Sequence, residues 1–313
     1  MRTLGQFLAA FAAVSSLALA SASAHADGLL TKPSALSAAD RAALEHAIAA
    51  DKAAHPEAFA AVAGVQGHLP AGYAHRQKPV PEVSRELEAL GADALLPMLA
   101  AIAFETPAAP GNNDAEREAL GVGLVRAVGH LRDARSAPVL RAVLQTSKPD
   151  ALVARFAAEG LGAVCSTVGA ADLIAHTAPS DPLRIAAIHG LGECRTLESA
   201  KHLASLVTPG LDAATARALG LALGRLASPG AWKAMGPSAT KTGDAVRAVV
   251  ADALFAGYVG NAGETRTMFH KGILIANPAD APTRIERARL GADAELGKNL
   301  DGLTRQLARK QRR

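Results

Sequence analysis

The stretch Leu183-Arg184-Ile185-Ala186-Ala187-Ile188-His189-Gly190-Leu191-Gly192 decides the fold of this chain. Counted from Leu183, its apolar or small residues fall at positions i, i+3, i+4, i+7 and i+8, a spacing that places them on one face of an α-helix. The residues at i+4 and i+7 are small, so a second helix can approach this face closely. The stretch therefore predicts a helix that packs tightly against its neighbours.

The same pattern, extended to i+11, recurs along the chain. Further copies begin at Leu120, Val153, Thr215 and Val246. A period of 20 to 50 residues is typical of stacked supersecondary units, each of which covers the apolar face of the next. We therefore expect a repeat protein.

Aspartates mark the same period. They recur at intervals of 31, 31 and 32 residues and are Asp150, Asp181, Asp212 and Asp244. Because each precedes a predicted helix, its carboxylate is expected to accept hydrogen bonds from the free N–H groups of the first turn.

A second, shorter apolar helix is predicted after each of these helices, for example at residues 137–144 and 199–206. Linkers with proline or glycine, such as residues 147–150, 179–182 and 208–212, then interrupt the chain. Each unit is thus predicted to be a helical hairpin.

Glycine follows the i+8 position in four copies of the pattern, as Gly129, Gly162, Gly192 and Gly224. A glycine within a helix costs about 1 kcal/mol relative to alanine. Its recurrence predicts that another helix passes too close to leave room for a side chain.

These residues resemble a known family. The stretch from Leu183, like the run from Ala245 to Leu254, is similar to the short HEAT repeats of the phycobiliprotein-lyase-like class. The resemblance covers residues 115–260, and more weakly residues 82–105. Together with the repeat pattern, it implies an all-α fold, an α-solenoid of about six stacked helical hairpins with helical caps at both ends. Proteins of this class serve as scaffolds, adaptors, lyase subunits and occasionally metalloenzymes, so the resemblance implies no single activity.

The first 26 residues are typical of a secretory signal peptide. Arg2 is followed by an uncharged stretch that ends in Ala24-His25-Ala26, an A-x-A cleavage pattern. A retained membrane anchor is the alternative, but the strongly apolar part from Phe7 to Ala20 is short for the roughly 20 residues that a spanning helix needs. We expect cleavage near Ala26 and a periplasmic or secreted mature protein.

The mature chain is expected to have three parts. Residues 27–81 form an N-terminal helical cap and an irregular connection, residues 82–260 form the HEAT-like array, and residues 261–313 form a C-terminal cap with a basic tail.

Within the N-terminal part, a capping-box pattern of Ser37 and Asp40 predicts a helix over residues 37–54. The glycine- and proline-rich residues 56–81 are expected to be irregular.

The charge of the chain is concentrated at its C-terminus. Residues 284–313 hold nine basic and four acidic side chains, although the whole chain has a net charge of only +4. The body therefore lacks the basic groove expected of a nucleic-acid-binding protein. The tail is compatible with weak contact to an anionic surface, and the alternative is a solvated terminus.

Two cysteines occur in a chain expected to meet an oxidising compartment. Cys165 and Cys194 fall near the ends of equivalent helices in neighbouring repeats, so a disulfide between them is one prediction. The alternative is that Cys194, at the apolar i+11 position, is a small core residue.

Metal and catalytic signatures are not found. His176, His189 and His202 are spaced by 13 residues, but no duplicated His-Glu motif, H-E-x-x-H or C-x-x-C accompanies them. The sequence also contains no G-x-S-x-G motif. No metal and no cofactor are expected, and the chain is not expected to be an enzyme.

The resulting prediction is an exported scaffold or adaptor that binds a protein partner on a concave face made by the second helices. Candidate contact residues on those helices are Arg141, His176, Lys201, His202 and Trp232. For Trp232, core filling is the alternative. The rival function is an enzyme or enzyme accessory subunit of lyase-like type that uses a pocket in the solenoid.

Overall fold

A computed structural model describes residues 27–67, 83–105, 114–149, 151–165, 167–236 and 239–311. In these residues the chain is helical throughout and contains no β-strand. None of the helices described is both long and apolar enough to span a membrane. The predicted signal peptide, Asp150, and the last two residues of the basic tail lie outside the described residues.

Helix α1 (Ala38–Ala54) begins where the capping pattern predicts it. The Asp40 N–H donates to Ser37 Oγ over 3.1 Å, and the Ser37 hydroxyl donates to the Asp40 carboxylate over 2.7 Å. One of the N–H groups that a helix start leaves free is thereby paired, and the second bond holds the two side chains together.

Helix α2 (Pro56–Gly67) occupies a segment that the sequence predicted to be irregular, so that prediction is wrong for residues 56–67. Pro56 stands at the first helical position, where its missing N–H is not needed. Both α1 and α2 pack against α4 (Leu95–Ala103), whose residues are all buried.

Two sets of helices alternate through the middle of the chain, and we call them first and second helices. The first helices are α3 (Val83–Ala89), α5 (Asp114–Leu131), α7 (Leu152–Val164), α9 (Arg184–Leu191) and α11 (Ala213–Leu226). The second helices are α4, α6 (Ala137–Thr146), α8 (Thr167–Ala175), α10 (Leu197–Ser205) and the short α12 (Pro229–Ala234).

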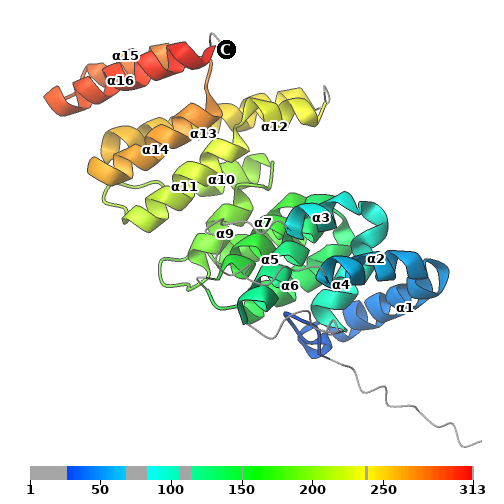
Figure 1. Cartoon of the computed structure of the whole chain (residues 1–313). Helices are drawn as coiled ribbons and strands as arrows, with labels where there is room; N and C mark the ends of the chain where they lie inside the picture. The colour runs from blue at the N-terminus through cyan, green and yellow to red at the C-terminus, as the bar shows by residue number, and fades with distance from the viewer. Residues whose placement is uncertain are drawn as a thin grey trace, which may run out of the picture.

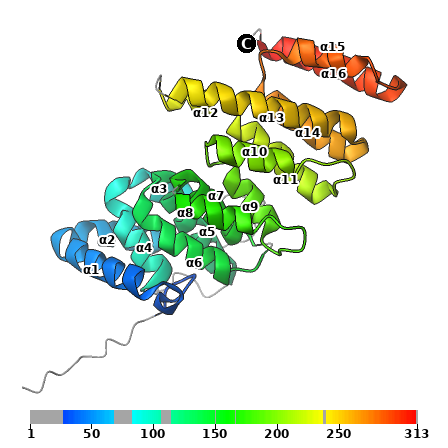
Figure 2. The same ribbon diagram turned by 180° about the vertical axis from the view of Figure 1, so that it is seen from behind.

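Each first helix packs against the next first helix in chain order, from α3 to α11, and α11 then packs against α14 (Gly263–Ala276). We call these six helices the first-helix row. Figure 1 and the opposite view in Figure 2 show the helices arranged along one direction, with α1 and α2 near one end and α15 and α16 at the other.

The repeated glycines lie where helices of this row touch, which confirms the sequence prediction. A Cβ on Gly162 would stand 1.8 Å from the Gly190 carbonyl oxygen, and one on Gly192 would stand 2.7 Å from Ala222 Cα. Gly129 faces Gly160 in the same way, at 2.8 Å. Such contacts exclude a side chain, because real Cβ atoms do not approach backbone atoms so closely.

The last hairpin departs from the predicted order. Helix α13 (Thr240–Gly260) carries the copy of the pattern that begins at Val246, so it was expected to be a first helix. Instead it packs against α10, a second helix, while α14 takes the place beside α11. Helix α12 has only six residues, and α13 fills the position in the second row that a longer α12 would occupy.

The boundary predicted at residue 260 therefore separates two helices, α13 and α14, that pack against each other and complete both rows. Beyond them, α15 (Ala281–Arg289) and α16 (Ala294–Gln311) form a terminal hairpin that touches α14. Four leucines at helical spacing on α16 are buried: Leu296, Leu300, Leu303 and Leu307.

Of the three repeated aspartates described, Asp212 behaves as predicted, because it accepts a hydrogen bond of 2.8 Å from the Thr215 N–H in the first turn of α11. Asp181 accepts one of 2.7 Å from the N–H of Leu183, which lies just before α9, so it does not bond the first turn of that helix as predicted. Asp244 is exposed within α13, which begins at Thr240, so it caps no helix start and that prediction is wrong.

Candidate functional site

Three of the predicted contact residues are bonded within the second helices and their loops. Arg141 on α6 forms an ion pair with Asp172 on α8. His176 Nδ1 lies 2.9 Å from Asp181 Oδ2, and His202 Nε2 lies 2.8 Å from Thr177 Oγ1. These side chains connect neighbouring structural elements, which leaves them poorly placed to bind a partner.

Lys201 and Trp232 differ from these three. Lys201 is exposed on α10. Trp232 is only 7% exposed, and its indole N–H donates to the Leu226 carbonyl over 2.7 Å. The prediction that Trp232 is an exposed aromatic anchor is therefore wrong, since this side chain fills the space between α12 and α13 and packs on Gly243.

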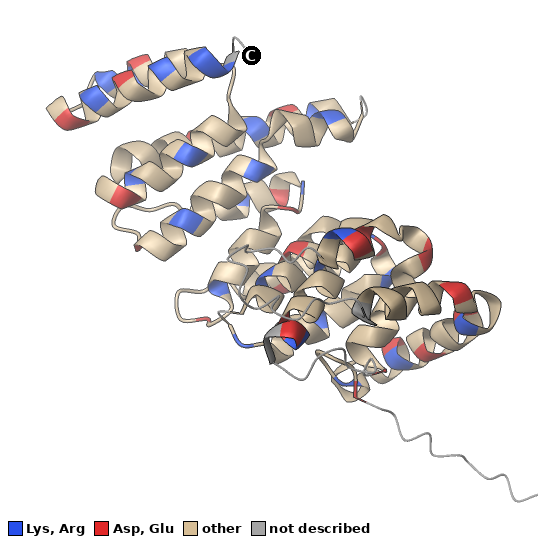
Figure 3. Cartoon of the chain, viewed as in Figure 1, with Lys and Arg blue, Asp and Glu red and all other residues tan. Residues whose placement is uncertain are grey.

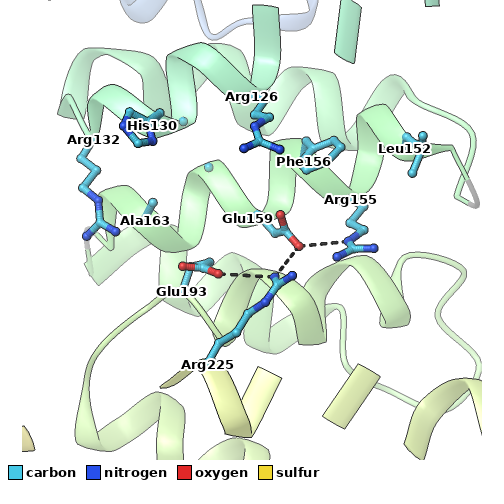
Figure 4. A pocket seen from close by; sticks show the side chains of 12 residues that line it. Arg126, His130, Arg132, Leu152, Arg155, Phe156, Glu159, Ala163, Glu193 and Arg225 are labelled. Atoms are coloured by element: carbon cyan, nitrogen blue, oxygen red, sulfur yellow. Dashed lines mark hydrogen bonds and ion pairs between the residues drawn. The ribbon is translucent and has the colours of Figure 1, made fainter. Parts of the chain in front are cut away.

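A depression in the surface lies on the other row, that of the first helices. It is a groove of about 500 Å³ that crosses the first helices α5 and α7 and reaches the ends of α9 and α11 (Figure 4). Its lining residues are Arg126, Gly129, His130, Arg132, Leu152, Arg155, Phe156, Glu159, Gly160, Ala163, Glu193 and Arg225. We call this depression the first-row groove.

Ion pairs order one wall of the first-row groove. Glu159 Oε1 accepts hydrogen bonds from Arg155 Nε at 3.0 Å and from Arg225 Nη1 at 2.9 Å, and the same Arg225 nitrogen lies 3.4 Å from Glu193 Oε1 (Figure 4). Arg225 on α11 thus reaches across α9 to α7. The Glu159 side chain is only 14% exposed, so these pairs are less screened than ordinary surface pairs.

Phe156 forms an apolar patch in the groove between two arginines. The Cζ atoms of Arg126 and Arg155 lie 5.8 and 5.9 Å from the centre of its ring. At this separation a guanidinium is attracted to an aromatic face. Arg126 is also held by Glu88 of α3 through an Nε to Oε1 contact of 2.9 Å.

His189 lies beneath this wall. It is 5% exposed, and its Nδ1 has no hydrogen-bond partner in the described part of the chain. Burial lowers the pKa of His189 to about 4, with the charge of Arg155 adding to the effect and Glu159 opposing it. The imidazole is therefore neutral at physiological pH.

Arg132 lines the groove, and Arg195 lies outside its lining, in the turn after α9. Arg132 ends α5 in the left-handed conformation, with φ of 56°, and Arg195 follows the last turn of the α9 segment. Burial and the nearby charge of Arg132 lower the pKa of Arg195, and Glu193 opposes this. Within the described residues, neither arginine is joined to a carboxylate by an ion pair.

The two cysteines lie next to this end of the groove. The structure joins Cys165, which ends α7, to Cys194, which follows α9, with 5.1 Å between their Cα atoms. That separation is normal for a disulfide. The bond connects two neighbouring first helices at the same end.

The repeat pattern contained a signal for this groove that our sequence analysis did not use. Arg126, Glu159 and His189 share template position i+6, and Glu193 and Arg225 share position i+10. Both positions flank the apolar stripe. The template alone does not show that equivalent side chains from several helices converge, so charged residues at these positions did not stand out.

The remaining charges are distributed without one dominant basic face. Basic and acidic side chains are interspersed over the helices in Figure 3. Arg305, Arg309 and Lys310 of the tail are exposed on α16. No group of three or more metal-ligating side chains occurs among the residues that the structure covers.

No family model, no curated protein and no solved structure matches this chain.

Proposed function

We propose that the protein is an exported α-solenoid of the HEAT type, and that it acts as a scaffold or adaptor by binding a protein partner in the first-row groove. The observation that carries this proposal is the origin of the groove in equivalent positions of consecutive first helices. A stack of repeats offers such positions as one continuous surface, which is how repeat proteins bind extended partners.

The solenoid part of the proposal is supported by the order of packing. Each first helix from α3 to α11 contacts the next, α14 extends this row, and α13 extends the row of second helices. The predicted leader in residues 1–26 supports export.

The proposed surface differs from the one that the sequence favoured. The second-row residues Arg141, His176 and His202 are engaged in internal contacts, and Trp232 is buried. The first-row groove instead presents polar groups in an ordered arrangement together with the Phe156 ring.

Binding is favoured over catalysis by the chemistry of the lining residues. The described residues that line the groove include arginine, glutamate, histidine and apolar side chains, but no hydroxyl, thiol or lysine nucleophile. Charged pairs around an open groove are suited to fixing the register of a partner.

Site-specific photo-crosslinking tests the proposal. The full chain, with its own leader, carries a photoreactive residue in place of Ala163 in the groove or, as the matched control, in place of Lys201 on α10. We expect a discrete protein adduct on illumination of cells with the Ala163 variant only, on a chain whose N-terminus is Asp27. Adducts from the Lys201 variant alone would show that the partner binds on the second helices and not in the groove. Adducts from neither variant would contradict a partner-binding role.

A further inference from the structure

The residues that follow the predicted leader are bound to the fold. Residues 27–33 run across the C-terminal end of α4 and reach α6 (Figure 1, Figure 2). We call these residues the N-terminal strap. The expected cleavage bond joins Ala26 to Asp27, the first residue of the strap. The mature chain is thus expected to begin at a packed part of the molecule.

The strap supplies hydrogen bonds that the end of α4 needs, because the last carbonyls of a helix have no partner within it. The Ala101 carbonyl accepts a hydrogen bond from the Leu29 N–H over 3.0 Å, and the Ile102 carbonyl accepts one from the Leu30 N–H over 3.1 Å. All residues of α4 are buried, so water cannot replace these donors unless the packing opens. The strap therefore completes α4.

Gly28 fits against α4 only because it has no side chain. A Cβ at this position would stand 2.3 Å from the Ile102 carbonyl oxygen and 2.4 Å from Ala103 Cα, and real Cβ atoms do not approach backbone atoms so closely. A Cβ on Gly64 of α2, in contrast, would meet nothing within 4 Å. Docking of the strap therefore requires glycine at position 28.

Side chains extend the contact to two further helices. Leu30 packs on α5, since a Cβ on Gly121 would stand 2.6 Å from Leu30 Cδ2. Thr31 is 5% exposed, and its Oγ1 lies 3.5 Å from Thr146 Oγ1 on α6. Pro33 is also buried. The strap thus joins α4, α5 and α6, and its release would expose both apolar groups and backbone carbonyls.

A docked strap is a poor substrate for a peptidase. Cleavage of a folded protein requires the segment around the cleaved bond to be free, so its rate follows the fraction of molecules in which that segment is open. Asp27 and Gly28 are the first two residues after the expected bond, and Gly28 lies against the backbone of α4. Docking and cleavage therefore compete for the same residues.

We propose that docking of the N-terminal strap shields the bond between Ala26 and Asp27 from signal peptidase, so that the leader is removed before the strap docks. The cleavage is a hydrolysis, in which water adds across this peptide bond and leaves a carboxylate on Ala26 and an amine on Asp27. The inference rests on the export part of the proposed function and goes beyond it, because it fixes the order of processing and folding.

Cleavage of the full precursor by purified signal peptidase in detergent tests this inference. The substrates are the folded precursor, residues 1–313, and a synthetic peptide of residues 1–35, which lacks α4. We expect the peptide to be cut before Asp27. The folded precursor should be cut at least about tenfold more slowly, because hydrogen bonds and apolar contacts keep the strap closed.

Variants locate the effect. In Gly28→Ala the added methyl prevents docking, so the folded precursor should be cut about as fast as a peptide with the same substitution. Leu30→Ala weakens the contact with α5 and should give an intermediate rate. The matched control Gly64→Ala should be as resistant as the native precursor. Peptides with each strap substitution measure its effect on the peptidase itself, and circular dichroism establishes that each precursor is folded.

Failure of this inference is distinguishable from failure of the proposed function. The inference is wrong if the folded native precursor is cut as fast as the peptide, or if Gly28→Ala and Leu30→Ala are as resistant as the native precursor. Cleavage of the peptide before Asp27 would then still support export. If neither peptide nor precursor is cut there, the inference and the export part of the proposed function are both wrong. Crosslinking from the Ala163 variant tests the scaffold part independently.

Discussion

Gly162 shows how a single residue sets the distance between two repeats. Its helix, α7, lies so close to α9 that the Gly190 carbonyl occupies the space of a side chain. Helix glycines are otherwise unfavourable, so this residue is explained by packing and not by local propensity.

The substitution Gly162→Ala is expected to destabilise the protein by about 1–3 kcal/mol or more, because the added methyl forces α7 and α9 apart. Gly302→Ala provides the matched control, since Gly302 lies within α16 with nothing within 4 Å of its Cβ position. That change should stabilise the protein by about 0.5–1 kcal/mol. Denaturant unfolding measures the change in the free energy of unfolding for each variant. If the two substitutions changed it in the same direction, the packing argument would be refuted.

His189 is the second residue with a measurable consequence. Its pKa is about 4 in the folded protein, below the value of 6.5 that is ordinary for a histidine. Between these values the unfolded state binds more protons than the folded state, so stability falls as pH decreases from about 6.5 to about 4.

We expect His189 to contribute a loss of up to about 3 kcal/mol over this interval, from the size of the shift. In His189→Leu this part of the pH dependence should vanish, because the buried, unpartnered imidazole is replaced by an apolar group. His270→Leu, at a less buried position, should retain it. The measurement is the free energy of unfolding of each protein at several pH values. If it depends on pH in the same way in the native protein and in His189→Leu, His189 does not have this role.

At the scale of elements, the pair α7 and α9 is held by packing and by a covalent bond. Cys165 adopts the left-handed conformation that ends α7, with φ of 40°, and this brings it to Cys194 at the end of the α9 segment. The bond closes a loop with a sequence separation of 29 residues.

Reduction of this disulfide is expected to lower the free energy of unfolding by about 3–4 kcal/mol, because the open chain gains conformational entropy when unfolded. Thermal unfolding with and without reductant measures the effect, and Cys165→Ser with Cys194→Ser should match the reduced protein and be insensitive to reductant. Mass spectrometry should show the native chain lighter than the reduced chain by two hydrogen atoms. Two thiols that react with an alkylating agent in the native protein without reductant would contradict the bond.

Element length also explains where the hairpin order changes. Helix α12 contains Pro229 at its start and ends at Ala234, so it is too short to cover α10. The longer α13 covers it instead, and α14 returns to the first-helix row. The pattern that begins at Val246 predicts the buried face of α13 correctly, with Val246, Val250 and Leu254 fully buried, but not the row in which it lies.

At the scale of the whole molecule, the groove arises from the packing of several first helices side by side. Arg225 and Glu159 are 66 residues apart in sequence yet form an ion pair, because their helices lie two places apart in the same row. The repeat period predicts that such residues occupy equivalent positions. It does not predict which of the two rows presents them to solvent.

The sequence by itself determined the helices, their apolar faces, the close contacts at the repeated glycines and the pairing of neighbouring repeats, because periodicity and residue size act locally and recur in each unit. Only the tertiary structure decided that α13 joins the second row, that Trp232 is buried, and that Arg225 reaches Glu159 across α9 at the edge of a groove. These features depend on distances between side chains that are far apart along the chain. Such distances follow from how the hairpins stack, which no local pattern specifies.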